Sequence, residues 1–190
     1  MKFKRIVYLL CCFSLLLFSC HTKKETVMPF RNLGYTSDRL LPVSLSSADF
    51  EFRIWINNST SIDRVISVSK DTLFGKGAYL TEIGQVFAKH KYKSKQFFNQ
   101  TKIVPKSGID GFITKIDSLK LSDFQSQDES TFSVALHTPF SLYVVELKEN
   151  GKYHCFKFNT HFPAKDQNDS KYIALENFIF SEFDYKFHMN

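Results

Sequence analysis

Histidine is the side chain in this sequence whose chemistry would be easiest to recognise, because imidazole binds transition metals and transfers protons near neutral pH. The histidines are His21, His90, His137, His154, His161 and His188. No His-Glu-x-x-His motif occurs, and no paired cysteines follow residue 20. On one continuous strand His154 and His161 would point to opposite faces, because their positions differ by an odd number. We therefore predict no metal site and no cofactor.

The neighbouring residues His154 and Cys155 form the most attractive candidate nucleophile and base. A thiolate and its base must be in contact, yet successive residues of a strand point to opposite faces. The Gly-x-Ser-x-Gly motif of a serine nucleophile is also missing from the chain. We interpret Cys155 as a small structural residue and predict no nucleophilic site.

Carboxylates and glycines give no stronger pattern. Hydrolysis of a glycoside needs two carboxylates held across a cleft, and no spacing pairs the acids of this chain in that way. The acids considered are Asp117, Asp123, Asp128, Glu129 and Glu146. Gly75-Lys76-Gly77 lacks the remainder of a phosphate-binding loop and fits a hairpin turn. We assign no catalytic residue, and a hydrolase with an unrecognised site stays an alternative.

Lysines recur at every second position in one segment, at Lys89, Lys91, Lys93 and Lys95. In a strand, all four side chains would project from one face. Such a row could contact anionic lipid head groups, an anionic glycan or an acidic partner. The alternative is an edge strand that its lysines protect against unwanted pairing.

The single tryptophan, Trp55, lies in a segment that alternates apolar and other residues. Phe50, Phe52, Ile54 and Ile56 would form one apolar face of a strand, which places Trp55 on the opposite face. Either a loop or the N-terminal segment covers that face, or the indole is an exposed contact site.

Cys20 ends a segment with the three parts of an export signal: a basic start, an apolar run from Ile6 to Phe18, and a small residue before the cysteine. The apolar run is shorter than the roughly 20 residues that span a bilayer. Leu17-Phe18-Ser19-Cys20 resembles the lipobox of bacterial lipoproteins, although Phe18 replaces the usual small residue. The resemblance implies cleavage before Cys20 and its acylation, for example with palmitate. An ordinary cleaved signal or an uncleaved membrane anchor is the alternative.

Cleavage before Cys20 would change both the charge and the cysteine count. Removing Lys2, Lys4 and Arg5 lowers the formal net charge from +6 to +3. With Cys20 acylated, Cys155 has no partner for an intrachain disulfide, so the core must supply the stability. The 21 phenylalanines of the chain are suited to that core. The modest charge and the envelope compartment argue against nucleic acid as a partner.

The residue pattern beyond the signal predicts one domain. We expect a signal peptide at 1–19, a lipidated and flexible tether at 20–47, and a single domain at 48–190. Strands are predicted from Phe50 to Ile56, from Arg64 to Ser69 and from Ala78 to about Phe87.

The second half of the domain is expected to hold two helices and a hairpin. Ser107, three residues before Asp110, predicts the start of an amphipathic helix. Asn150-Gly151 predicts a type I′ turn between strands at 141–148 and 152–159. Asp169 or Ser170 can cap a second helix. The order β-β-β-α-β-β-α predicts an α+β domain, with an antiparallel sheet of about five strands and two helices on one face.

The run from Lys102 to Gly108, the strand with Tyr143 and Glu146, and the strand with Tyr153 and Phe156 resemble a group of uncharacterised Bacteroidetes lipoproteins. The likeness spans about Phe50 to Phe187 and implies a lipoprotein, without implying an activity.

These features predict a lipid-anchored lipoprotein of the cell envelope. We expect a non-enzymatic module that binds another envelope protein, in the manner of an immunity protein or an inhibitor. A glycan- or lipid-binding accessory protein and an envelope hydrolase are the alternatives. His21 stands where an aspartate would imply retention in the inner membrane, so we expect an outer-membrane anchor with the domain facing the periplasm.

Overall fold

The computed structural model describes residues 40, 42–57, 62–87, 94–127, 142–160 and 167–184, without the side chains of 85–87, 94–96 and 167–168. The expected signal peptide and Cys20 lie outside these residues, as does most of the expected tether. No helix among the described residues is both long and apolar enough to cross a membrane.

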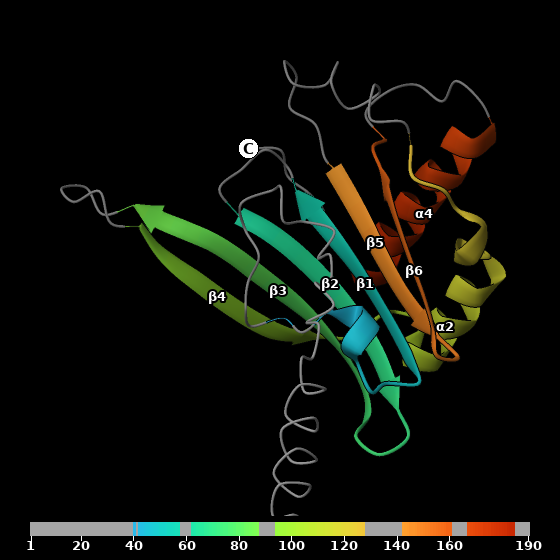
Figure 1. Cartoon of the computed structure of the whole chain (residues 1–190), viewed down its shortest axis with the longest axis horizontal. Helices are drawn as coiled ribbons and strands as arrows, with labels where there is room; N and C mark the ends of the chain where they lie inside the picture. Colours follow the sequence, from blue (N-terminus) through green and yellow to red (C-terminus); the bar gives the residue numbers. More distant parts are fainter. Residues whose placement is uncertain are drawn as a thin grey trace, which may run out of the picture.

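The described residues form an antiparallel six-stranded sheet in the order β4-β3-β2-β1-β5-β6, together with two helices (Figure 1). The strands are β1 (Phe50–Asn57), β2 (Ile62–Asp71), β3 (Gly75–Phe87), β4 (Ser94–Ile103), β5 (Leu142–Glu149) and β6 (Lys152–Phe158). The helices are α2 (Gly108–Ser118) and α4 (Gln167–Phe183). Short 3-10 helices, η2 (Val43–Leu45) and η3 (Leu121–Asp123), precede β1 and follow α2.

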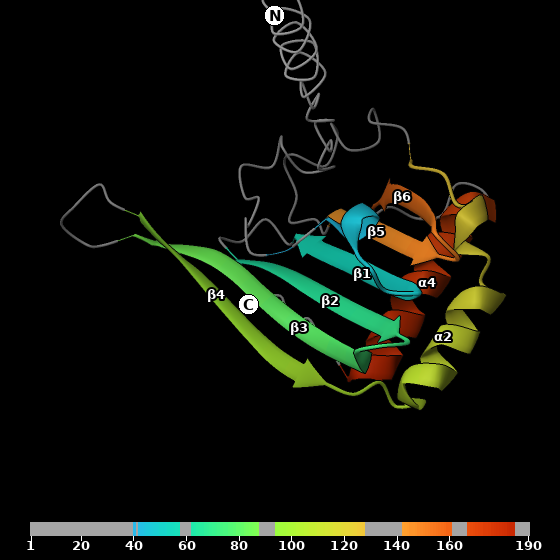
Figure 2. The same cartoon turned by 60° about the horizontal axis from the view of Figure 1, so that its bottom comes forward.

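One face of the sheet is covered by both helices, as Figure 2 shows. Phe52 and Ile54 of β1 are fully buried on this face, as the alternation of the sequence predicts. The ring of Phe112 in α2 lies 5.5 Å from that of Phe52, measured between centroids. Tyr172 of α4 stacks on Phe158 of β6 at 5.1 Å. Burial of each such large side chain contributes roughly 2–3 kcal/mol to folding.

The expected α+β class is therefore confirmed, with two helices on one face, but the expected number of strands is one too few. The additional strand is β4, which gives four strands before α2 in place of three. Its exposed residues, such as Asn99 and Gln100, are polar, because β4 lies at an edge away from the helices. A polar edge strand lacks the alternation of apolar residues that predicts the other strands from the sequence.

The hairpin of β5 and β6 has the predicted turn, which sets the register of the two strands. Asn150 and Gly151 have positive φ angles of 50° and 74°, as a type I′ turn requires. Leu147 pairs with His154, and Glu146 pairs with Cys155. His154 and Cys155 thus belong to opposite faces of the sheet.

The helix starts are partly as predicted. Ser107 is the N-cap of α2, but its hydroxyl makes no capping bond within that helix and donates to Glu182 of α4, with an oxygen–oxygen distance of 2.8 Å. Helix α4 begins at Gln167, which is earlier than the predicted cap at Asp169 or Ser170. Asp169 lies in its first turn, where a carboxylate favours the helix dipole.

The segment before β1 packs on the face opposite the helices. Val43 of η2 is fully buried, and η2 lies against β5. The Lys148 ammonium donates to the Ser46 carbonyl oxygen. Part of the stretch expected as tether therefore covers the sheet from Pro42 onward.

Candidate functional site

The face of the sheet opposite the helices carries a buried cluster of charged side chains. Arg53 of β1 contacts two carboxylates, with 2.7 Å between Nη2 and Glu51 Oε1 and 3.8 Å between Nη1 and Glu146 Oε2. All three residues are less than a tenth exposed. A guanidinium between two carboxylates keeps opposite charges paired where water is largely excluded.

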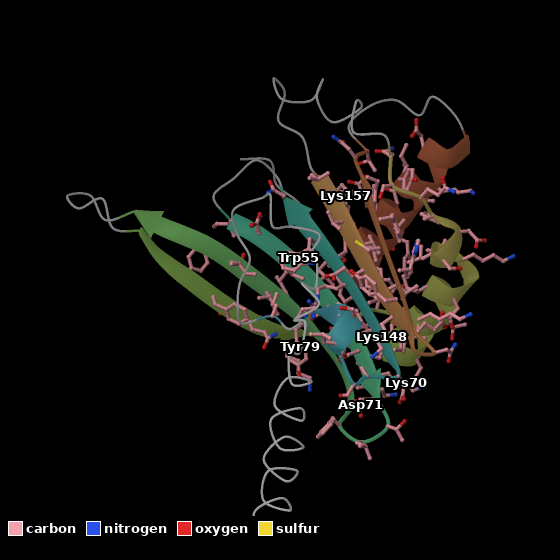
Figure 3. All side chains as sticks on the ribbon, in the orientation of Figure 1. Trp55, Lys70, Asp71, Tyr79, Lys148 and Lys157 are labelled. Carbon is pink, nitrogen blue, oxygen red and sulfur yellow. The ribbon has the colours of Figure 1, made fainter. Side chains whose placement is uncertain are left out.

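Glu146 is the acceptor around which this cluster is arranged. The Trp55 indole N–H donates to Oε2 at 2.8 Å, and the Tyr153 hydroxyl donates to Oε1 at 3.0 Å. Trp55, labelled in Figure 3, lies on the sheet face that the sequence predicts, and its indole N–H is directed at Glu146. The indole is half-buried. Its N–H is bonded within the protein, and part of the ring surface is accessible to solvent.

Ionisation of the neighbouring phenol and thiol is disfavoured. Burial, assisted by the negative charge of Glu146, raises the pKa of Tyr153. Burial also raises the pKa of Cys155, and Glu146 adds to this effect, whereas Tyr153 and Lys157 offset it in part. His154 cannot act as the base for the thiol, because its Nε2 lies on the other face, 2.8 Å from the Phe124 carbonyl oxygen. This site therefore lacks an activated nucleophile.

A cleft of about 280 Å³ lies on the same face, between the start of β1 and the hairpin of β2 and β3. We call it the hydroxyl cleft, since Ser46, Ser67, Ser69 and Tyr79 contribute to its lining. Glu51 also lines it, so the charged cluster borders the cleft. Ser67, Ser69 and Tyr79 occupy alternate positions of β2 and β3 that point away from the helices.

The position of the Tyr79 ring depends on a glycine two residues earlier. A Cβ atom placed on Gly77 would lie 2.9 Å from Cε2 of Tyr79, which is closer than real contacts allow. The ring thus occupies the space that a side chain at position 77 would fill. Any larger residue there would displace Tyr79 and reshape the hydroxyl cleft.

The turn of Thr72, Leu73 and Phe74 joins β2 to β3 directly after Asp71, which is labelled near the bottom of the ribbon in Figure 3. Asp71 Oδ1 accepts the backbone N–H groups of Leu73 and Phe74, at 2.7 and 3.0 Å. These two bonds are the main reason that the pKa of Asp71 is lowered. Asp49 accepts the N–H of Thr72 at 2.9 Å and also its hydroxyl. Side chains therefore fix the backbone of this turn.

No family model, curated protein or solved structure matches the chain. The residues of the site are therefore the basis for any statement about function.

Other residues singled out from the sequence lie apart from the cleft or outside the description. Cys20, Lys89, Lys91 and Lys93 lie outside the described residues, and Lys95 is placed in β4 by its backbone alone. Within the described part of the chain, no group of three or more His, Cys, Asp or Glu side chains could hold a metal ion.

The lining of the hydroxyl cleft was not predicted from the sequence. Its one signal is the serine at every second position of β2, Ser67 and Ser69, opposite the apolar Ile66 and Val68. Such an alternation also describes an ordinary solvent-facing side of a strand. The cleft forms because residues 46–49 pack against the β2–β3 hairpin beside this side of β2.

Proposed function

We propose that this protein is a lipid-anchored lipoprotein of the bacterial cell envelope. We further propose that it binds another envelope protein without catalysing a reaction, and that a segment of this partner enters the hydroxyl cleft. The anchor is supported by the sequence around Cys20 and by its resemblance to a lipobox. The outer membrane, with the domain facing the periplasm, is the proposed location.

The observation that carries the binding proposal is the combination of hydroxyl groups with a partly exposed aromatic ring. Ser69 and Tyr79 can each donate and accept a hydrogen bond, and Ser67, whose hydroxyl donates to the Tyr79 carbonyl oxygen, can accept one. These groups suit the N–H and C=O groups of a peptide. The Tyr79 ring lies among these hydroxyl groups and is partly exposed. Exposed aromatic residues beside hydrogen-bonding groups are typical of protein interfaces.

The size of the cleft limits what can enter it. A cleft of about 280 Å³ is at the lower limit of the roughly 300–1,000 Å³ found for small-molecule sites. We infer that it takes a few residues of a partner, while the rest of the partner contacts the surrounding surface.

Filling the cleft tests this proposal. A Ser69→Trp variant places a large side chain inside it, and Ser122→Trp, on the exposed η3 turn, is the matched control. Each full chain is produced in cells, cross-linked, and its co-purified proteins are quantified by mass spectrometry. We expect one envelope protein that co-purifies with the wild type and with Ser122→Trp, but not with Ser69→Trp. Equal recovery with all three would refute binding at the cleft.

A glycan is the second candidate ligand, because aromatic rings beside hydroxyl and carboxylate groups also bind sugars. Tyr79, Phe74 and Glu51 give the cleft this composition. Binding of soluble envelope glycan to the purified chain, lost in Ser69→Trp and kept in Ser122→Trp, would favour it over a protein partner.

Metabolic labelling tests the anchor separately. The wild-type chain should take up a palmitate analogue and Cys20→Ala should not. Label retained by the variant would refute acylation at this residue.

A further inference from the structure

We propose that the turn of Thr72, Leu73 and Phe74, here called the hairpin tip, inserts its two apolar side chains into the interfacial layer of the bilayer that holds the lipid anchor. This inference rests on the anchor in the proposed function and adds a second membrane contact to it. It assigns Phe74, at the edge of the hydroxyl cleft, to the lipid surface, and leaves Ser67, Ser69 and Tyr79 for the protein segment.

The exposure of the hairpin tip is the first observation. Leu73 is 85% exposed and Phe74 is 84% exposed. Single exposed apolar residues are common on protein surfaces. Here two large ones are adjacent in the turn between β2 and β3, which lies at the outer end of that hairpin in Figure 1.

The second observation is that the backbone donors of the hairpin tip are already bonded. The N–H groups of Leu73 and Phe74 donate to Asp71, and that of Thr72 donates to Asp49. A backbone N–H without a partner is costly to move out of water. Since all three are bonded, the tip can enter a less polar layer without leaving a donor unpaired. The same bonds fix the turn, so little conformational freedom is lost on insertion.

The third observation is where the chain from the anchor joins the domain. Ser47 donates to Asp71, and Asp49 accepts from Thr72, so residues 47–49 lie against the base of the hairpin tip. Pro42 lies 22 positions after Cys20, and a chain of that length would span about 25 Å if it behaved as a flexible coil. An acyl group on Cys20 would thus keep the bilayer within reach of this end of the domain.

The charged side chains behind the hairpin tip nearly balance, because Asp49, Asp71 and Asp110 lie near the two lysines. Lys70 and Lys76 flank the turn, and both ammonium groups contact Asp110 of α2. Their side chains are about half exposed, so the ammonium groups can also approach lipid phosphates.

The single tryptophan of the chain allows a direct test. Lipidated full chains are reconstituted in vesicles of phosphatidylcholine and phosphatidylglycerol, with or without bromine on the acyl chains, and tryptophan emission is recorded. The variants are Phe74→Trp and Ala174→Trp, the latter at an exposed position of α4. Wild type reports on Trp55 alone, which lies on the sheet face.

We expect brominated lipid to quench the emission added by Phe74→Trp, and that emission to shift to shorter wavelength, with no such loss for wild type or Ala174→Trp. If Phe74→Trp unfolds, as judged by circular dichroism, Leu73→Trp replaces it with the same expectation. Chains that float with the vesicles but show no quenching at the tip would overturn this inference and leave the anchor standing. Quenching of Phe74→Trp emission in a chain that also carries Cys20→Ala would support insertion of the hairpin tip and would show that it does not depend on the lipid anchor.

Discussion

At the residue scale, Glu146 is a buried carboxylate with three polar neighbours. It accepts from Trp55 and Tyr153 and lies beside the guanidinium of Arg53. Its position in β5 opposite Cys155 could be predicted, because the Asn-Gly turn sets the register of the hairpin. Its partnership with Trp55 could not, because β1 precedes β5 by some ninety residues and only the sheet order brings them together.

Replacing this carboxylate with an amide should destabilise the domain. Glu146→Gln removes a negative charge beside the buried Arg53, although Glu51 remains 2.7 Å away. We expect a loss of about 2 kcal/mol in the free energy of unfolding, measured by urea denaturation. Asp123→Asn, at an exposed position of η3, is the control and should change stability by less than about 0.5 kcal/mol. A neutral Glu146→Gln would show that the charged cluster does not support the fold.

A carboxyl group in β2 should make stability depend on pH near neutrality. Burial raises the pKa of Asp63 from its ordinary value of 3.8 to about 6. The folded state therefore binds the proton of Asp63 more tightly than the unfolded state does. The contribution of this proton to stability is complete below pH 3.8 and is lost as the pH rises through 6.

Asp63→Asn should consequently raise stability where the carboxylate is ionised. Because Asp63 is only partly buried, we expect a gain of about 1 kcal/mol at pH 7.5 and little change at pH 3.5. Thermal melts at both pH values measure this difference. Equal effects at the two pH values would contradict the role of ionisation.

At the element scale, local signals gave the hairpin of β5 and β6 and the position of α2, whereas contacts between distant segments did not follow from the sequence. Strand β4 was missed because its edge position permits polar residues. The bond from Ser107 to Glu182 could not be predicted either, because the residues around Ser107 indicate a helix start and give no sign of a partner in α4. This bond joins the start of α2 to the end of α4.

Glu182 of α4 links the two helices through hydrogen bonds. It accepts from the N–H of Ser107 at 2.9 Å, from the Ser107 hydroxyl and from the Lys115 ammonium at 2.6 Å. Burial acts to raise its pKa, but the bonds from Lys115 and Ser107 together outweigh burial and lower the pKa below 4.5. Its contribution to stability is therefore present above pH 4.5 and is lost as the pH falls through the lowered value.

Glu182→Gln should cost about 2 kcal/mol at pH 7 and should reduce the loss of stability between pH 5 and 3. The matched control is Asp184→Asn, because Asp184 pairs with Lys106 in a highly exposed position and such pairs contribute at most about 1 kcal/mol. Urea denaturation across this pH range measures both variants. An unchanged acid sensitivity in Glu182→Gln would assign the pH dependence to other groups.

At the scale of the whole molecule, the two faces of the sheet have different roles. The helices and the phenylalanine-rich core stabilise one face, and the other carries the charged cluster, the hydroxyl cleft and the hairpin tip. The α+β class followed from the order of elements, because each apolar pattern has its own period. The cleft did not, because it forms where residues 46–49 cross a hairpin about 20 residues further along the chain.

The most direct test of the binding proposal is photo-cross-linking from the cleft in living cells. A photoreactive phenylalanine derivative at position 69 lies within the cleft, and the same group at position 122 lies on an exposed turn away from it. The proposal predicts a discrete cross-linked envelope protein from position 69 that is absent from position 122. No cross-linked protein from position 69, or the same products from both positions, would contradict it.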